Sequence, residues 1–336
     1  MTQFSVPVYE YKSVRPGAPV TPQHPNFVLN DRQLVIATVR AILTTGAGKP
    51  ARKLTAAIVW PMLRFMLDWR AAPNIQLAPH FSKNVRDFSF TSRIGELAQG
   101  ASCAYWKWAR GYAWICDFGP WAAGLHPTLP TGKMPDFVMF NAHTGDLAIM
   151  EAKGTGGHDY KGLMSKALQQ CGAALVKNQF HRGYGSVLTL DRKAVATGRA
   201  ELHLRDPNVD SGVSEWTAYE VFRRSYASWF DLIGQQDMAA WCRQYVRDPA
   251  EAAATYALAF VDKAQQDDSI GWIVADSVLP ALGFDRSRTQ FSVDPAVLRA
   301  LSDFDIFKKR EWLSAIHAGI EKNKISFPDG TIIKVR

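Results

Sequence analysis

Residues 135–153 read PDFVMFNAHTGDLAIMEAK. Two apolar runs in this stretch flank Thr144-Gly145-Asp146, a tripeptide that is typical of a turn. Short apolar runs bounded by turn residues favour buried strands. The stretch is therefore expected to form a hairpin of two strands, near 135–140 and 147–153, and this hairpin decides the fold.

Charged residues stand at the open end of the expected hairpin. Residues two apart in a strand point to the same face of a sheet, so Glu151 and Lys153 are expected to project together while Ala152 points the other way. The hairpin also brings Asp136 close to Glu151. We therefore expect two carboxylates and one ammonium group to converge at one edge of a sheet.

Such a cluster has a chemical use. Two neighbouring carboxylates are unfavourable unless a cation neutralises them, and Mg²⁺ or Mn²⁺ accepts carboxylate oxygens. A bound Mg²⁺ polarises a phosphoryl oxygen and lowers the pKa of a coordinated water. An ammonium group beside the metal orients that water or offsets charge that develops on the phosphate. These are the parts that phosphodiester hydrolysis needs.

The elements around the hairpin complete an α/β pattern. Apolar residues at helical spacing predict helices on both sides of the hairpin, and β-branched segments predict two further strands. The expected elements are a helix at 92–110 with Ser92 as its cap, a strand at 112–118, a loop rich in Pro and Gly at 119–133, a helix at 160–178 and a strand at 186–190. This order predicts a mixed sheet flanked by helices.

The spacing of Pro135-Asp136 and Glu151-Ala152-Lys153 resembles that of the PD-(D/E)xK nuclease superfamily, which includes restriction endonucleases, repair nucleases and Holliday-junction resolvases. The resemblance covers about a third of the chain. It implies a restriction-endonuclease-like αβββαβ core, with Asp136 and Glu151 as ligands of Mg²⁺ (or Mn²⁺) and Lys153 assisting the attacking water. All three residues would then be catalytic.

The resemblance also directs attention to the helix at 92–110. Many members of the superfamily carry a further acidic metal ligand on their first core helix, and Glu96 is the candidate here. Around the helix, Glu96 lies nearly opposite the apolar stripe of Ile94 to Trp108. Glu96 therefore reaches the site only if the helix is covered on two sides. The alternative is a glutamate that faces solvent.

Candidate contacts to nucleic acid follow the hairpin. Lys161, Lys166 and Gln170 lie on the expected helix 160–178, and His158 lies in the Gly-rich loop before it. Positive charge and amide groups at these positions suit a phosphate backbone. The alternative for each is an ordinary surface residue.

The flanking regions differ from this core, and three regions are expected. Residues 1–90 combine a Pro-rich arm with two helices near 31–44, capped by Asp31, and 53–69. Residues 91–212 form the nuclease core. Residues 213–336 are mainly helical, most clearly at 251–263, and end in a short hairpin around Pro328-Asp329-Gly330. The arm is a candidate docking segment for a partner protein or a second copy of the chain.

Composition narrows the class of protein. The chain has 336 residues, of which 47% are hydrophobic and 21% charged, as expected for a folded chain with a large core. Lys and Arg number 39 against 31 Asp and Glu, and this modest excess of 8 is compatible with a polyanionic partner. The four cysteines form no C-x-x-C pair, which favours reduced thiols in the cytoplasm. No apolar run is long enough for a membrane span.

The sequence therefore predicts a cytoplasmic, Mg²⁺-dependent DNA endonuclease that acts on double-stranded DNA, with restriction or phage defence as its natural role by analogy with the superfamily. Two alternatives remain. One is a secreted antibacterial nuclease toxin, and the other is a nucleic-acid-binding protein without enzymatic activity whose acidic cluster is structural.

Overall fold

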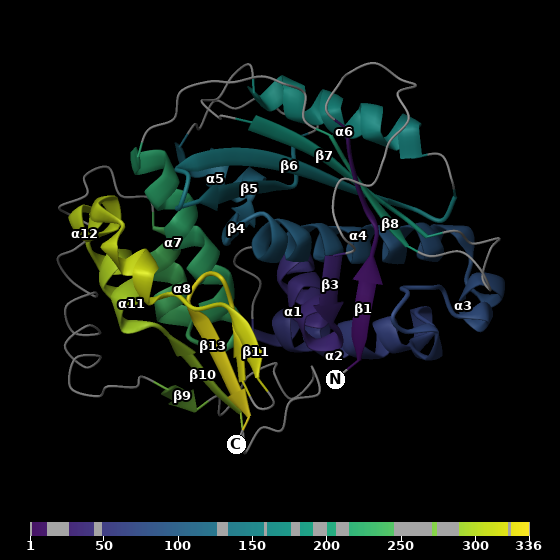
Figure 1. Cartoon of the computed structure of the whole chain (residues 1–336), viewed down its shortest axis with the longest axis horizontal. Helices are drawn as coiled ribbons and strands as arrows, with labels where there is room; N and C mark the ends of the chain where they lie inside the picture. The colour runs from purple at the N-terminus through teal and green to yellow at the C-terminus, as the bar shows by residue number, and fades with distance from the viewer. Residues whose placement is uncertain are drawn as a thin grey trace.

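A mixed six-stranded sheet forms the centre of the chain, with strand order β2-β8-β7-β6-β5-β4 (Figure 1). The computed structural model describes residues 2–11, 27–43, 49–125, 134–157, 160–175, 182–190, 200–205, 215–244, 271–273, 289–321 and 324–335. Within these residues the central strands are β2 (Val8–Tyr11), β4 (Trp114–Asp117), β5 (Phe137–Asn141), β6 (Asp146–Thr155), β7 (Arg182–Thr189) and β8 (Glu201–Arg205). The protein is thus of the α/β class, as predicted.

The expected hairpin is present and sets the topology. β4, β5 and β6 pair antiparallel in sequence order, and helix α6 (Tyr160–Leu175) then connects β6 to the parallel strand β7. β8 pairs antiparallel with β7, and β2 pairs parallel with β8. The adjacency of the three strands predicted at 112–118, 135–140 and 147–153 is therefore confirmed, whereas β2 and β8 were not predicted.

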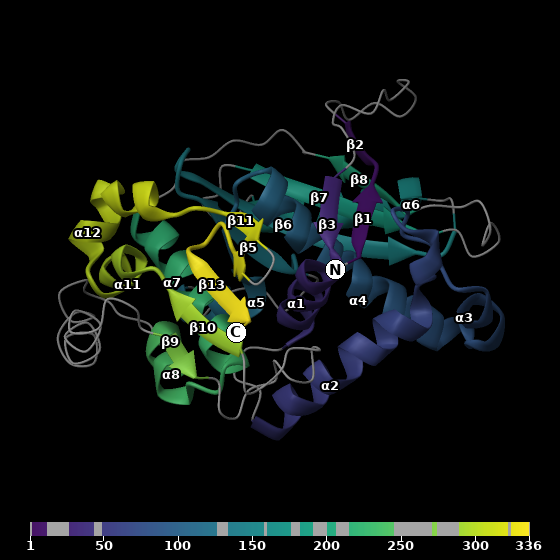
Figure 2. The ribbon, with the colours of Figure 1, turned by 60° about the horizontal axis from the view of Figure 1, so that its bottom comes forward.

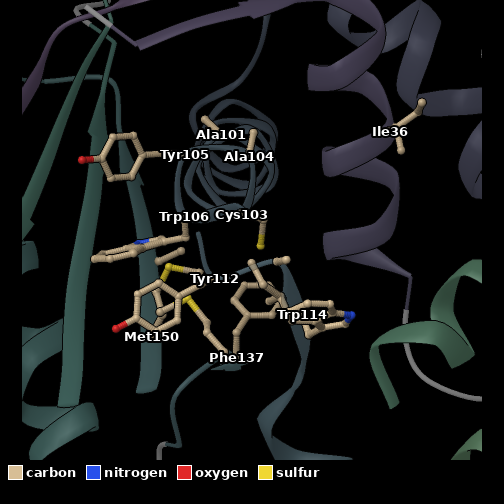
Figure 3. Packing of buried hydrophobic residues seen from close by; sticks show 14 of the residues in the cluster. Ile36, Ala101, Cys103, Ala104, Tyr105, Trp106, Tyr112, Trp114, Phe137 and Met150 are labelled. Atoms are coloured by element: carbon tan, nitrogen blue, oxygen red, sulfur yellow. The ribbon is translucent and has the colours of Figure 1, made fainter. Parts of the chain in front are cut away.

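The sheet is covered on both faces. Helix α6 lies over one face, and helix α4 (Asp87–Ala109) lies across the other (Figure 1). Figure 3 shows Cys103 and Trp106 of α4 directed toward Phe137 and Met150 of the sheet. All four side chains are buried.

Helix α4 is also covered on its outer side, by α1 (Asp31–Ile42). The closest approach is at Gly100, where an added Cβ would lie 2.1 Å from the Thr38 hydroxyl oxygen. Glycine is therefore required at this crossing, since any side chain would push the helices apart. Burial from two sides explains why Lys107, which lies off the predicted apolar stripe, is only 6% exposed.

Helix boundaries differ from the prediction in several places. Asn30, not Asp31, caps α1 by a reciprocal pair of hydrogen bonds with Gln33, because its side chain reaches the Gln33 amide at 2.8 Å. Helix α4 begins at Asp87, so Ser92 is internal. The remaining N-terminal elements are β1 (Gln3–Val6), β3 (Phe27–Asn30), α2 (Lys49–Met66) and α3 (Pro79–Asn84), and α5 (Phe118–Leu125) forms within the stretch predicted as a loop.

The N-terminal arm packs within the chain where it is described. β1 pairs with β3, and β2 extends the central sheet. Pro7 separates β1 from β2, as suits a residue that cannot donate to a ladder. The other prolines of the arm lie outside the described residues.

The C-terminal region contains more strand than predicted. Its elements are α7 (Glu215–Leu232), α8 (Gln236–Arg243), α11 (Pro295–Ser302), α12 (Phe304–Lys309), β9 (Gly271–Ile273), β10 (Thr289–Val293), β11 (Gly319–Glu321), β12 (Lys324–Ser326) and β13 (Thr331–Val335). The five strands form a second sheet, so "mainly helical" was incomplete. The predicted terminal hairpin is confirmed as β12–β13, with Gly330 at φ +81° in its turn. The helix predicted at 251–263 lies outside the described residues.

A buried ionic cluster ties this region to the core. Asp329, in the turn of the terminal hairpin, contacts Lys107 of α4 at 2.5 Å and Arg40 of α1 at 3.5 Å. The Trp229 indole N–H of α7 donates to the same carboxylate oxygen at 2.8 Å. Four segments distant in sequence therefore meet at one carboxylate.

The four cysteines are free thiols, as predicted. Among the described helices, none combines the length and the hydrophobicity that crossing a bilayer requires.

Candidate active site

The predicted cluster assembles where the sheet splits. Phe137 pairs with Met150, so one further step along the register sets Asp136 opposite Glu151. β5 ends there, whereas β6 continues to Thr155. The backbone N–H of Ala152 therefore lacks a strand partner on that side, and it donates instead to Asp136 Oδ2 at 2.9 Å. Strand register alone thus brings the two carboxylates together.

Glu151 is the most buried member of the cluster. Its side chain is 1% exposed, and the Lys153 ammonium binds one of its oxygens. The other oxygen, Oε2, is buried and has no hydrogen-bond partner in the described part of the chain. An unsatisfied buried carboxylate oxygen is unfavourable, and a bound cation would relieve it.

The pKa values of the two carboxyl groups also favour a bound cation. Burial raises the pKa of Glu151 to about 7, and the negative charge of Asp136 adds to the rise while Lys153 opposes it. Burial also raises the pKa of Asp136, against the opposing effects of the Ala152 amide, Lys153 and Gln99. Both carboxyl groups are thus held in a setting that disfavours two negative charges without a further cation.

Helix α4 presents Gln99 to this site, while Glu96, one turn earlier, pairs with Arg93. Both oxygens of Glu96 accept from Arg93 Nη1, at 2.9 and 2.8 Å. Gln99 lies one turn further along and hydrogen-bonds Asp136, which lowers the pKa of that carboxyl. Gln99 is three residues before Ser102, whose hydroxyl meets Ser186 of β7 at 2.7 Å, so the two residues share one side of α4.

Beside the carboxylates lies an open groove of about 670 Å³, lined by Lys153, Lys166, Gln169, Gln170 and Ala173. The groove runs between the end of β6 and one side of α6. The Lys153 side chain is 29% exposed. It contacts the buried Glu151 and also lines the groove. Of the predicted nucleic-acid contacts, Lys166 and Gln170 lie here.

Gln170 also has a structural contact. Its side-chain N–H donates to the Met134 carbonyl oxygen at 3.1 Å, two residues before Asp136. Lys161 is exposed at the start of α6 and is not part of the groove lining. His158 lies outside the described residues.

The residues present fit one small hard cation. Among the described residues there is no group of three or more His, Cys, Asp or Glu side chains placed to hold a metal. Mg²⁺ commonly takes only one or two protein carboxylates and keeps several waters. Asp136 and Glu151 supply that number, and Oε2 of Glu151 is the free donor atom.

Comparison with known proteins gives no relative: no protein-family model matches the chain, and no curated protein and no solved structure matches it.

Proposed function

We propose that this protein is a metal-dependent nuclease that hydrolyses phosphodiester bonds at Asp136, Glu151 and Lys153. The observation that carries the proposal is the buried Oε2 of Glu151, which has no hydrogen-bond partner among the described residues and lies beside the half-buried carboxyl of Asp136 and an ammonium group that lines an open groove. A purely structural acidic pair would have its oxygens satisfied, so the arrangement favours an enzyme over a binding protein without activity.

Each residue has a distinct task in this proposal. Asp136 and Glu151 hold Mg²⁺ or Mn²⁺, which when bound polarises a phosphoryl oxygen and activates a water. Lys153 holds the attacking water or offsets charge on the phosphate, since its ammonium group lies between Glu151 and the groove. The Ala152 amide fixes Asp136, and Gln99 supports it.

The order of elements supports the narrower assignment to a restriction-endonuclease-like core. Helix α4, strands β4, β5 and β6, helix α6 and strand β7 follow one another as αβββαβ, with α5 inserted after β4. The resemblance to the PD-(D/E)xK superfamily implies this order, and here Asp136 directly precedes β5 while Glu151 and Lys153 lie on β6. Double-stranded DNA, a cytoplasmic location and a role in restriction or phage defence remain parts of the proposal, carried by that resemblance.

The decisive experiment incubates the full chain with plasmid, linear duplex, single-stranded DNA and RNA, each with Mg²⁺ and each with excess chelator. We expect Mg²⁺-dependent cleavage of at least one substrate, and nicked or linear plasmid as the endonuclease product. Cleavage of none of the four with Mg²⁺ or Mn²⁺ would reject the proposal. If expression of the wild type, but not of Glu151→Gln, stopped cell growth, the result would support a nuclease, whether endonuclease or secreted toxin, over a binding protein without activity.

A further inference from the structure

An exposed apolar face lies on α2, away from the active site. Ile58 is 42% exposed and Phe65 is 48% exposed, seven residues apart and so on one side of the helix. Pro61 and Arg64, between them, are also exposed. Most large apolar side chains of the described residues are buried, so this run is unusual and has to be explained.

The Phe65 ring is held in place from one side. Its centroid lies 4.9 Å from that of His80 and 5.6 Å from that of Phe81, both on α3. A ring nitrogen of His80 lies 2.8 Å from the Phe65 carbonyl oxygen. The ring is thus supported and yet about half exposed, which is the arrangement of a stacking platform.

Positive charges lie on the same segments of the chain as this ring, with Arg64 next to it on α2, Lys83 on α3 and Arg86 just before α4. Arg64, Lys83 and Arg86 are exposed, and the Arg64 guanidinium lies over the Trp60 and Trp69 rings at 5.2 and 5.1 Å. No ion pair joins Lys83 or Arg86 to an acidic residue whose side chain the structure describes. Cations interleaved with aromatic rings are complementary to a ligand that is polyanionic and also offers flat apolar faces.

A continuous row of rings connects this surface to the catalytic strand. Phe81 packs against Phe90 of α4 at 5.5 Å. An added Cβ at Gly156 would lie 2.2 Å from the Phe90 ring, so the chain just after Lys153 rests on that ring. Figure 2 shows α2 and α3 following one another along the outside of the molecule beside α4. The segment just after Lys153 therefore packs on the same row of rings that supports Phe65.

We propose that the α2–α3 surface, formed by Ile58, Arg64, Phe65, His80, Lys83 and Arg86, binds a single-stranded nucleic-acid segment. A base stacks on Phe65, and Lys83 and Arg86 contact the flanking phosphates. The segment is single-stranded because bases inside a duplex stack on each other and expose only their edges to a ring on a convex helix. The inference rests on the proposed function for the identity of the ligand, since a nuclease substrate is the polyanion that the active site would hold.

The test measures binding of the full chain to a fluorescent single-stranded oligonucleotide and to a blunt duplex of the same length, in chelator so that cleavage is excluded. Phe65→Ala should weaken single-strand binding about tenfold, as loss of one stacked base does, and Phe65→Tyr should keep it. Lys83→Gln with Arg86→Gln should lower the slope of log affinity against log salt by roughly 0.7 per removed cation. Val28→Ala and Lys308→Gln, an exposed apolar residue and an exposed cation elsewhere, should bind like the wild type.

Two results would overturn the inference. One is single-strand binding that is absent in the wild type or unchanged in Phe65→Ala and in the double variant. The other is binding to phosphatidylserine–phosphatidylcholine vesicles that depends on Phe65 while oligonucleotide binding does not, which would assign the surface to a membrane. Cleavage in Mg²⁺ is scored separately: a wild type that binds through Phe65 but never cleaves rejects only the proposed function, whereas a wild type that cleaves but binds independently of Phe65 rejects only this surface.

Discussion

The backbone N–H of Ala152 donates to Asp136 Oδ2 at 2.9 Å, so a side-chain carboxylate takes the place of a neighbouring strand where β5 ends. This contact fixes Asp136 through the backbone of β6, the strand that also carries Glu151 and Lys153. The geometry of the cluster thus depends on the register of one hairpin. Variants that change only the side-chain chemistry of the cluster should therefore leave the fold unchanged.

Asp136→Asn, Glu151→Gln and Lys153→Ala should each abolish or nearly abolish phosphodiester cleavage. The first two substitutions preserve size and remove a ligand charge, and the third removes the ammonium group that faces the groove. We expect rates lower by roughly 10²–10⁴-fold, the scale of removed electrostatic or acid–base groups. Plasmid cleavage in Mg²⁺ measures the effect, and circular dichroism checks the fold.

The matched control is Asp305→Asn, the same acid-to-amide change at a 79% exposed residue that pairs with Lys308 on α12. It should cleave like the wild type. Wild-type rates in all three cluster variants, or cleavage that persists in excess chelator, would remove the activity from this site.

The stability of the metal-free protein should depend on Glu151 and on pH. The pKa of Glu151 is about 7 when folded, against an ordinary value of 4.5, so the folded chain holds this proton more tightly than the unfolded chain. Its contribution to stability is present below pH 4.5 and is lost as the pH rises to about 7. In chelator, Glu151→Gln should therefore be more stable than the wild type at pH 8, by about 1–3 kcal/mol, and gain little at pH 5.

Denaturant titrations at the two pH values measure this effect, and Mg²⁺ supplies a second readout. Adding Mg²⁺ at pH 8 should stabilise the wild type and have little effect on Glu151→Gln, because a ligand that binds only the folded state shifts the unfolding equilibrium. Equal free energies of unfolding for the two proteins at pH 8 in chelator would show that folding does not raise the pKa of Glu151.

Local patterns were enough to predict the hairpin of β5 and β6, which carries the candidate site. A turn tripeptide between two apolar runs determines the register, and the register alone sets Asp136 opposite Glu151. The element order from α4 to β7 also followed from period changes in the sequence. Glu96 was named because it is acidic, whereas the structure turns Gln99 toward Asp136.

The missed elements depend on partners distant in the chain. β2 is four residues long and is a strand because it pairs with β8, almost 200 residues away. Short segments of this kind carry too little periodicity to be separated from loops. Likewise, Lys107 is charged and lies near the end of a helix, so nothing local indicates that it is buried against Asp329. Tertiary packing, not propensity, determines these features.

Gln99→Glu should create a third carboxylate at the site. The stability of the protein should then depend more strongly on bound metal. Gln99 hydrogen-bonds Asp136, so a negative charge there would repel the carboxyl groups of Asp136 and Glu151, whose pKa values are already raised. We expect a lower melting temperature in chelator and a larger rise on adding Mg²⁺ than in the wild type. Asp305→Asn, an acid-to-amide change at an exposed residue of α12, is the control and should show the wild-type rise. A variant that melts like the wild type in chelator would place Gln99 outside the site.

Asp329→Asn should destabilise the whole chain without changing the active site. Burial raises the pKa of Asp329, but the positive charges of Lys107 and Arg40 lower it by more. The pKa therefore lies below its ordinary value, and the carboxylate is charged in the folded protein. The amide would leave the buried cations Lys107 and Arg40 without their shared anion, at a cost of about 3–5 kcal/mol. Because this pKa is depressed, the contribution of Asp329 is present above pH 4 and lost as the pH falls through the folded pKa. Denaturant titration at pH 7 should therefore show the lower free energy of unfolding, and on acidification the stability of the wild type should fall toward that of the variant.

Adding Lys107→Met to Asp329→Asn should recover part of the stability by removing one unpaired charge, while Mg²⁺ binding stays unchanged. An Asp329→Asn protein as stable as the wild type at pH 7 would show that the cluster does not hold the C-terminal region on the core.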